Sequence, residues 1–325
     1  AVLAARGEHD ARPRPRERGR HLRAEARAGA GDDDDAAGQG LGGGLLLTRS
    51  HGSNYPTICD NLTSDFRDRT ATEEQALNKI KQLEDLPGLI PEGSTVVLGG
   101  GWFANHPMAA VRELIRAGRD DLHAIALLGS IDVDLLVGAR ALRHLTFSMV
   151  TLEAFGLATN FRRAVQSGEL PITEISALSL QVALEAGAHR VPFLPLRGPV
   201  GSDLVAMHPD FYGTASTSLG DADVPVVKAV RPDVALLHAT RCDALGNVQH
   251  EGTYAMDPEL ARASDRVIVT CEEIVPTEAV AADASLTRIP GLLVDAVIEA
   301  PFGAHPCSHV PRYAQDAWKL LDYQK

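Results

Sequence analysis

The sequence contains few aromatic residues, few cysteines and no long apolar run, and each shortage excludes something. Aromatic residues make up 5% of the 325 residues, so a core has to be built from aliphatic side chains. No apolar run approaches the roughly 20 residues that cross a bilayer, so we expect no membrane-bound form. The cysteines form no Cys-x-x-Cys pair and indicate reduced thiols in a cytoplasmic protein: Cys59, Cys242, Cys271 and Cys307.

Positive charge is also in short supply. The chain has 31 Lys and Arg against 43 Asp and Glu, a formal net charge of −12. Nucleic-acid-binding proteins generally carry excess positive charge, so we expect no nucleic-acid partner. The length, with 45% hydrophobic residues, is sufficient for one large domain or two ordinary ones.

The first 50 residues lack aromatic and isoleucine side chains, and 28 of them are Ala, Gly or Arg. A segment without large apolar side chains cannot offset the entropy lost on ordering. We therefore predict a disordered extension over residues 1–63 and a folded domain over 64–325. Alternating arginines between positions 12 and 20 leave open a targeting segment, and upstream sequence attached by a wrong start is a further alternative.

Short apolar runs alternate with helical patterns along the rest of the chain. The first two runs end at Gly99 and Gly129, and a helical pattern commonly follows a run. This alternation predicts an α/β fold with an open, mostly parallel sheet flanked by helices. The expected strands are 96–98, 123–128, 145–150, 234–239, 266–271 and 292–299, the expected helices are 73–86, 108–117, 161–168 and 177–188, and long loops are expected over 198–230.

The sharpest motif is EGSTVVLGGGWFANHP at positions 92–107. Three glycines directly after a strand remove Cβ atoms where a ligand or another backbone can approach. Free N–H groups there, with the N-terminus of the following helix, would favour a negative group. The loop is neither a Gly-x-Gly-x-x-Gly dinucleotide fingerprint nor a Walker loop. A plain tight turn remains the alternative.

This motif resembles the signature of the alpha subunit of family I CoA-transferases. Several motif positions match, whereas Gly101 stands where the family has Phe and Asn105 where it has a second Gly. Asn tolerates a positive φ better than most residues, which makes the second change mild. Further stretches resemble the same family across about residues 70–313. The matching motif positions are Gly93, Val96, Val97, Leu98, Gly99, Gly100 and Pro107.

The resemblance implies a three-layer fold and a two-subunit enzyme that moves CoA from an acyl-CoA to a small carboxylic acid. In such enzymes a glutamate attacks the thioester and carries CoA as a glutamyl thioester. That glutamate belongs to the beta subunit, so we expect no catalytic residue in this chain and an obligate beta partner. The acyl-CoA is a substrate, and no permanently bound cofactor is expected.

Candidate site residues follow from the motif and from strand ends. The substrate or oxyanion loop comprises Gly99, Gly100, Gly101, Trp102 and Asn105. Possible substrate contacts are Glu153, Arg197, Ser202 and Asp203, each with an ordinary polar turn or helix cap as the alternative.

Two further patterns are weaker. Glu272 and Glu273 follow a strand, as the family nucleophile does, but the sequence after them is Ile-Val rather than the Asn-Gly that the family pattern has. His305, Cys307 and His309 alternate, yet we expect no metal site because their setting is ordinary family sequence.

Two other functions stay open. Ring-opening hydrolases with the same two-subunit fold carry a glutamate near the helix that starts after position 175, where this sequence offers only Glu174. A non-catalytic ligand-binding paralogue would keep the fold without a catalytic partner. The acyl substrate is not specified by the sequence.

Overall fold

The computed structural model describes residues 79–218, 220 and 223–324. The predicted extension over 1–63 and the predicted domain start at residue 64 lie outside the described residues. No helix among the described residues is both long enough and apolar enough to cross a membrane.

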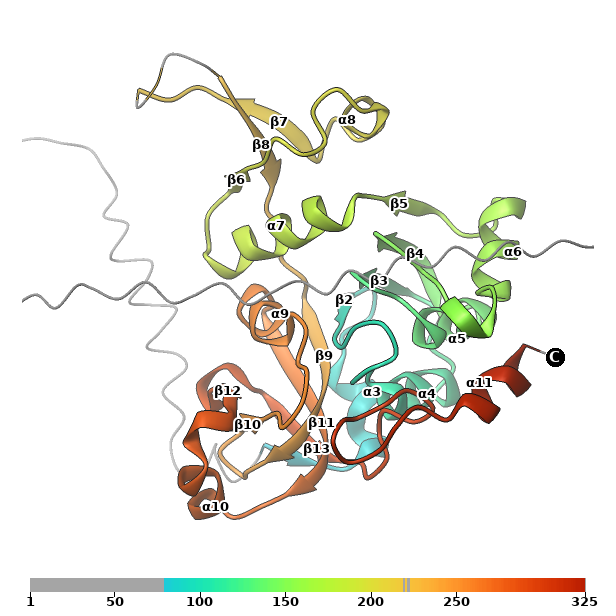
Figure 1. Ribbon diagram of the computed structural model, residues 1–325, viewed down its shortest axis with the longest axis vertical. Coiled ribbons are helices and arrows are strands. Elements are labelled where there is room, and N and C mark those ends of the chain that lie inside the picture. Colours follow the sequence, from blue (N-terminus) through green and yellow to red (C-terminus); the bar gives the residue numbers. More distant parts are fainter. Residues whose placement is uncertain (1–78, 219, 221–222, 325) are drawn as a thin grey trace, which may run out of the picture. The chain divides into compact units, whose positions relative to one another are not determined.

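The centre of the fold is a sheet whose eight main strands are all parallel (Figure 1). The sheet confirms the predicted mostly parallel α/β architecture. A short antiparallel pair, β10 (Val248–Gln249) and β12 (Thr287–Ile289), extends from β9. In spatial order the main strands are β1 (Ile80–Lys81), β13 (Ala296–Glu299), β11 (Arg266–Ile274), β9 (Val234–Cys242), β2 (Thr95–Leu98), β3 (Leu122–Ala126), β4 (Leu142–Phe147) and β5 (Ile172–Glu174).

Alternating side chains of the strands enter two separate cores, one on each face of the sheet. On β2, Val96 and Leu98 join one core and Val97 joins the other. The first core contains α3 (Leu86–Leu89), α4 (Met108–Arg116), α5 (Ile131–Gly138) and α6 (Thr159–Ser167), and the second contains α7 (Ala177–Ala188) and α9 (Asp257–Ala263). This is the three-layer arrangement that the family resemblance implies. Two further helices are α10 (Thr277–Ala282) and α11 (Ala317–Tyr323).

Helix α7 runs over the predicted 177–188, but two other expectations are wrong. Ile80 and Lys81 form an edge strand beside Val297 and Ile298, although a helix was expected over 73–86. Residues 73–78 of that range lie outside the described residues, and of 79–86 only Leu83–Asp85 and Leu86 are helical. The start of the strand expected over 292–299 is instead a 3-10 turn, Gly291–Leu293.

Helix α5 was not predicted. Its sequence, IDVDLLVG, buries Asp132 and Asp134 together with its apolar residues, so it has no polar face for a periodicity argument to detect.

The region 198–230 is a small antiparallel sheet rather than long loops. Its strands lie in the order β6 (Phe193–Pro195), β8 (Val224–Lys228), β7 (Tyr212–Ala215). Helix α8 (Asp203–Met207) lies between β6 and β7 in the sequence (Figure 1). Tyr212 and Val227 pair across it and are buried in the second core beside α7. On such a ribbon only every second residue needs to be apolar. The search for continuous apolar runs in the sequence therefore did not detect these strands.

Candidate functional site at the carboxyl edge of the sheet

The glycine loop leaves the carboxyl end of β2. We call the side of the sheet where the parallel strands end its carboxyl edge and the side where they begin its amino edge, and open parallel sheets bind their ligands at the carboxyl edge. Gly99 follows Leu98 directly, and the chain returns into α4 at Met108. The tip of the loop is exposed at Trp102, whose side chain is 55% accessible and whose φ is 55°. The sequence therefore placed this motif correctly between a strand and a helix.

The three glycine amides all donate hydrogen bonds within the chain. Gly99 N–H donates to the Leu236 carbonyl at 2.8 Å and Gly101 N–H to the Ala104 carbonyl at 2.9 Å. Gly100 N–H donates to Asp257 Oδ1 at 2.9 Å. The free donors expected in this loop are therefore engaged, because the loop folds back on itself and against β9 and α9.

Close packing explains why glycine stands at positions 99 and 100. A Cβ atom at position 99 would lie 2.6 Å from Leu237 Cδ2 and 2.7 Å from Asp257 Oδ1. At position 100 it would lie 2.6 Å from the Ala104 carbonyl oxygen, and φ is +78° there. All three distances are shorter than real Cβ atoms show, so the loop keeps this shape only with glycine at these positions.

Asn105 takes a φ of 59°, in agreement with the expectation that Asn replaces a family glycine without strain. Its side chain is buried, and Nδ2 donates to the Thr253 carbonyl. Its backbone N–H donates to the Ser308 carbonyl at 2.9 Å, and Ser308 N–H donates back to the Phe103 carbonyl at 2.6 Å. The C-terminal segment 300–316 thus holds the glycine loop from one side.

A buried ion pair holds the end of the loop. His106 Nδ1 lies 2.8 Å from Asp132 Oδ2, and Nε2 lies 2.5 Å from the Trp102 carbonyl oxygen. Both partners are acceptors, so both ring nitrogens carry a proton. Burial opposes this charge, but Asp132 outweighs it and raises the pKa of His106. Sequence analysis missed the pair because Asp132 lies in the unpredicted helix α5.

Asp257 and His250 are buried beneath the loop. Asp257 Oδ2 and both His250 ring nitrogens have no hydrogen-bond partner within the part of the chain that the structure describes, and Oδ2 lies 3.9 Å from His250 Nε2. Burial raises the pKa of Asp257 to about 7, although the Gly100 hydrogen bond opposes the shift. Burial, followed by the charges of His309 and His238, lowers the pKa of His250 to about 3.

A second polar cluster, which we call the His–Glu cluster, consists of His238, Glu272, His309 and Tyr313. Glu272 Oε1 lies 2.8 Å from His238 Nε2 and accepts from the Tyr313 hydroxyl at 2.5 Å. Glu272 Oε2 accepts from the Phe302 N–H at 2.7 Å. Burial opposes ionisation, but these hydrogen bonds outweigh it and lower the pKa of Glu272 to about 2.

The predicted substrate-contact residues fall into two groups. Glu153 is exposed, with φ 45°, in the 3-10 turn Glu153–Phe155. This turn packs on the glycine loop, since the Phe155 and Phe103 rings meet edge to face at 5.3 Å. Arg197, Ser202 and Asp203 are exposed between β6 and α8, and Ser202 Oγ donates to the Pro199 carbonyl. The substrate role of all four residues stays a prediction.

The alternating His305, Cys307 and His309 do not converge. His305 Nε2 lies 2.9 Å from Asp316 Oδ2 near the surface, whereas Cys307 and His309 are buried. Glu273 lies at the surface, where it forms a 3.4 Å ion pair with Arg312.

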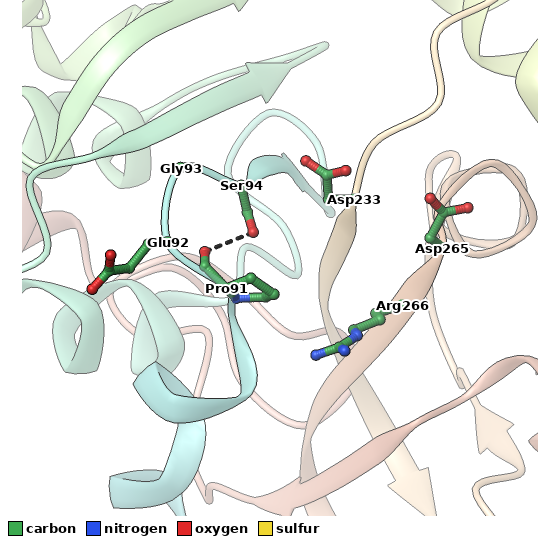
Figure 2. Close-up of a pocket in the computed structure, with 7 residues that line it drawn as sticks. All are labelled: Pro91, Glu92, Gly93, Ser94, Asp233, Asp265 and Arg266. Atoms are coloured by element: carbon green, nitrogen blue, oxygen red, sulfur yellow. Dashed lines mark hydrogen bonds between the residues drawn. The ribbon is translucent and has the colours of Figure 1, made fainter.

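A cavity of about 320 Å³ lies at the opposite edge of the sheet (Figure 2). Asp233 and Asp265 reach it from the starts of β9 and β11, and Pro91 to Ser94 close it, with Ser94 Oγ donating to the Pro91 carbonyl. Because parallel sheets bind ligands at the carboxyl edge, this amino-edge cavity is the weaker candidate.

Comparisons with known proteins point to one group. The family model described as Coenzyme A transferase matches residues 82–300. A 3-oxoadipate CoA-transferase subunit from Pseudomonas knackmussii is 35% identical over 72% of this chain and 82% of its own. An uncharacterized protein of Archaeoglobus fulgidus is 34% identical over 82% of this chain, which spans only 58% of that protein. The cholesterol ring-cleaving hydrolase IpdA subunit of Rhodococcus jostii is 31% identical over 69% and 78% of the two chains.

Two solved structures share the fold. Glutaconate coenzyme A-transferase from Acidaminococcus fermentans superimposes with a TM-score of 0.71 at 28% identity, covering 76% of this chain and 83% of that one. A variant of the decarboxylase AibA/AibB has a TM-score of 0.70 at 31% identity, covering 75% and 90%. The activities in these names differ, although the scaffold is shared.

Proposed function

Because the chain belongs to the coenzyme A transferase family, we propose that it is the alpha-type subunit of a two-subunit CoA-transferase. It would act with a beta-type chain to move CoA between an acyl-CoA and a small carboxylic acid. The observation that carries the proposal is the glycine loop at the carboxyl edge, fixed in shape by Asp257 and Ser308. The names of relatives that are single subunits of CoA-transferases support it.

The reactive glutamate is proposed to belong to the partner. Its carboxylate attacks the thioester carbonyl and expels the CoA thiolate, which leaves an acyl-glutamyl anhydride. The thiolate then attacks the glutamyl carbonyl and releases the acid, so that the glutamate carries CoA until a second carboxylate reverses the sequence. CoA thioesters are thus substrates, and no permanently bound cofactor takes part.

The state of Glu272 supports this assignment. Both of its oxygens accept hydrogen bonds, and its pKa is lowered to about 2, so its lone pairs are stabilised rather than reactive. A carboxylate that is held so firmly by donors is a poor nucleophile.

The direct test is co-expression with a candidate beta-type chain from the same genome, followed by an assay with acyl-CoA donors and labelled free acids. We expect a stable complex that transfers CoA to the acid. Borohydride reduction during turnover should then mark a glutamate of the partner. Thioester turnover by the isolated chain, or a mark on one of its own glutamates, would contradict the proposal.

A thioester or ring-opening hydrolase is the second candidate, because one relative is named a ring-cleaving hydrolase subunit. Glu174 is exposed at the end of β5, two residues before Ser176 caps α7. Hydrolysis would release free CoA or a ring-opened acyl-CoA without labelling an added acid, and Glu174→Gln would abolish it. A ligand-binding paralogue would bind no beta-type chain and would neither transfer CoA to an acid nor hydrolyse the acyl-CoA.

The expected cytoplasmic location and the expected absence of nucleic-acid and membrane partners stay predictions.

A further inference from the structure

We infer that His238, Glu272 and His309 form a zinc-binding site on this chain. One ligand atom from each residue lies within 4.8 Å of the other two, and among the described residues this is the group of His, Cys, Asp and Glu that meets that condition. Two imidazoles and one carboxylate are a donor set that Zn²⁺ uses in proteins. The proposal replaces the expectation of no metal site, and it is independent of the reaction assigned to the chain.

The parallel register of β9 and β11 brings the first two ligands together. His238 on β9 lies opposite Thr270 on β11, and Glu272 follows two residues later on the same face of the strand. His309 arrives from the C-terminal segment, and its ring centroid lies 5.0 Å from that of His238. Three segments far apart in sequence therefore converge at one buried point.

Each of the first two ligands is oriented by a neighbour. His238 Nδ1 lies 2.9 Å from Thr270 Oγ1, and the Thr270 hydroxyl donates to the Leu237 carbonyl at 3.1 Å. Thr270 then accepts from Nδ1–H, and Nε2 is turned toward Glu272. The Phe302 N–H and the Tyr313 hydroxyl hold the carboxylate. Orienting hydrogen bonds of this kind accompany metal-ligating histidines and carboxylates.

His309 supplies an observation that points to a missing partner. Its side chain is 1% exposed, and Nε2 lies 3.0 Å from Thr240 Oγ1. No group among the described residues forms a hydrogen bond with its buried Nδ1, and such an arrangement is costly for a polar atom. Metal binding would satisfy this histidine.

Little movement of the ligands is needed to admit a zinc ion. The 2.8 Å contact between His238 and Glu272 would open by about 0.5 Å around a tetrahedral ion.

A metal here would stabilise the glycine loop. His309 follows Ser308, whose backbone exchanges hydrogen bonds with Phe103 and Asn105 of the loop. Fixing His309 therefore fixes the segment that holds the loop, and Trp102 at the loop tip can report the effect.

The first experiment measures zinc in the purified full chain by mass spectrometry and titrates the metal-free chain with ZnCl₂ and CoCl₂. We expect one zinc per chain and visible Co²⁺ absorption of a four-coordinate site. His309→Ala and the isosteric Glu272→Gln should each weaken zinc binding at least tenfold. His144→Ala is the matched control, because His144 contacts His123 at 4.5 Å between ring centroids on the same sheet without a carboxylate in that contact.

Circular dichroism identifies variants that fail to fold, and if His309→Ala does so, Glu272→Gln carries the test. Zinc affinity equal to that of the control in a folded variant would overturn the site. So would a wild-type chain that binds no zinc.

A second readout uses the tryptophan at the loop tip. In a Trp318→Phe background Trp102 is the sole tryptophan of the sequence, and we expect its emission to shift when zinc is added. The shift should disappear in Glu272→Gln and persist in His144→Ala. Zinc binding without any shift would overturn the coupling between the metal and the loop.

Discussion

The two edges of the central sheet are built differently. At the carboxyl edge the glycine loop is packed against Asp257, and the His106–Asp132 pair is buried. At the amino edge, around the cavity of Figure 2, the turn at Gly93 has open space and the Arg190–Asp265 pair is exposed. Buried charge and constrained backbone cost stability, and such costs are commonly retained at functional sites, so the contrast supports the proposal that the carboxyl edge is the functional one.

The largest expected effect comes from breaking the buried ion pair. Asp132→Ala leaves a buried cationic His106 without its partner, and we expect a loss of about 3–5 kcal/mol in the free energy of unfolding. Arg190→Gln at the amino edge removes an exposed pair, worth less than about 1 kcal/mol. Urea unfolding of both variants measures the difference, and equal losses would erase the contrast between the edges.

Adding one methyl group at each edge is the next test. Gly100→Ala places Cβ against the Ala104 carbonyl oxygen at a φ of +78°, and we expect a loss of about 3 kcal/mol. Gly93 has a similar φ, +70°, but no described residue has an atom within 4 Å of the added Cβ, so for Gly93→Ala only the backbone strain of about 1 kcal/mol remains. Thermal unfolding measures both losses. If Gly100→Ala lost no more stability than Gly93→Ala, the loop would have to shift to accept the methyl group.

Titration of Asp257 gives a smaller, pH-dependent effect. Its folded pKa of about 7 exceeds the ordinary 3.8, so the folded chain binds more protons between these values and its stability falls as pH rises toward 7. Asp257→Asn does not titrate. Relative to this variant, wild type should lose on the order of a few kcal/mol of unfolding free energy between pH 5 and 8. If the unfolding free energies of wild type and Asp257→Asn changed with pH in parallel, the raised pKa of Asp257 would be contradicted.

The smallest effect on stability is expected at Arg197. Its side chain is exposed, so Arg197→Ala should change the unfolding free energy by less than about 0.5 kcal/mol. If the guanidinium binds a substrate carboxylate, KM for the free acid rises about tenfold in the reconstituted complex while KM for the acyl-CoA stays constant. Unchanged values for both substrates would remove Arg197 from the site.

Local signals in the sequence predicted much of the fold. The runs around Val96 and Val267 were continuously apolar, and helix 177–188 has buried positions at helical spacing, so those elements were found. Ile80 was misassigned because its spacing from Leu83 suits a helix, whereas pairing with Val297 makes it an edge strand. Tertiary contacts of this kind leave no local trace in a single sequence.

The candidate site was predicted in part for the same reason. The glycine loop lies within one motif, so its position followed directly from the sequence. His238 and Glu272 are 34 residues apart and meet only through the register of β9 and β11. A usable signal was present, since each is a polar residue toward the end of an otherwise apolar strand, but aligning the two strands required the sheet order.

The hydrogen bonds of the glycine loop have a consequence for selectivity. The amides of positions 99, 100 and 101 are all engaged inside the chain, so none of these three N–H groups is free to receive a negative group. If the loop lines the proposed active site, the donors for developing negative charge have to be other groups than the glycine amides. The preference of the enzyme for one acyl group over another would then depend on those other groups and on the shape of the loop.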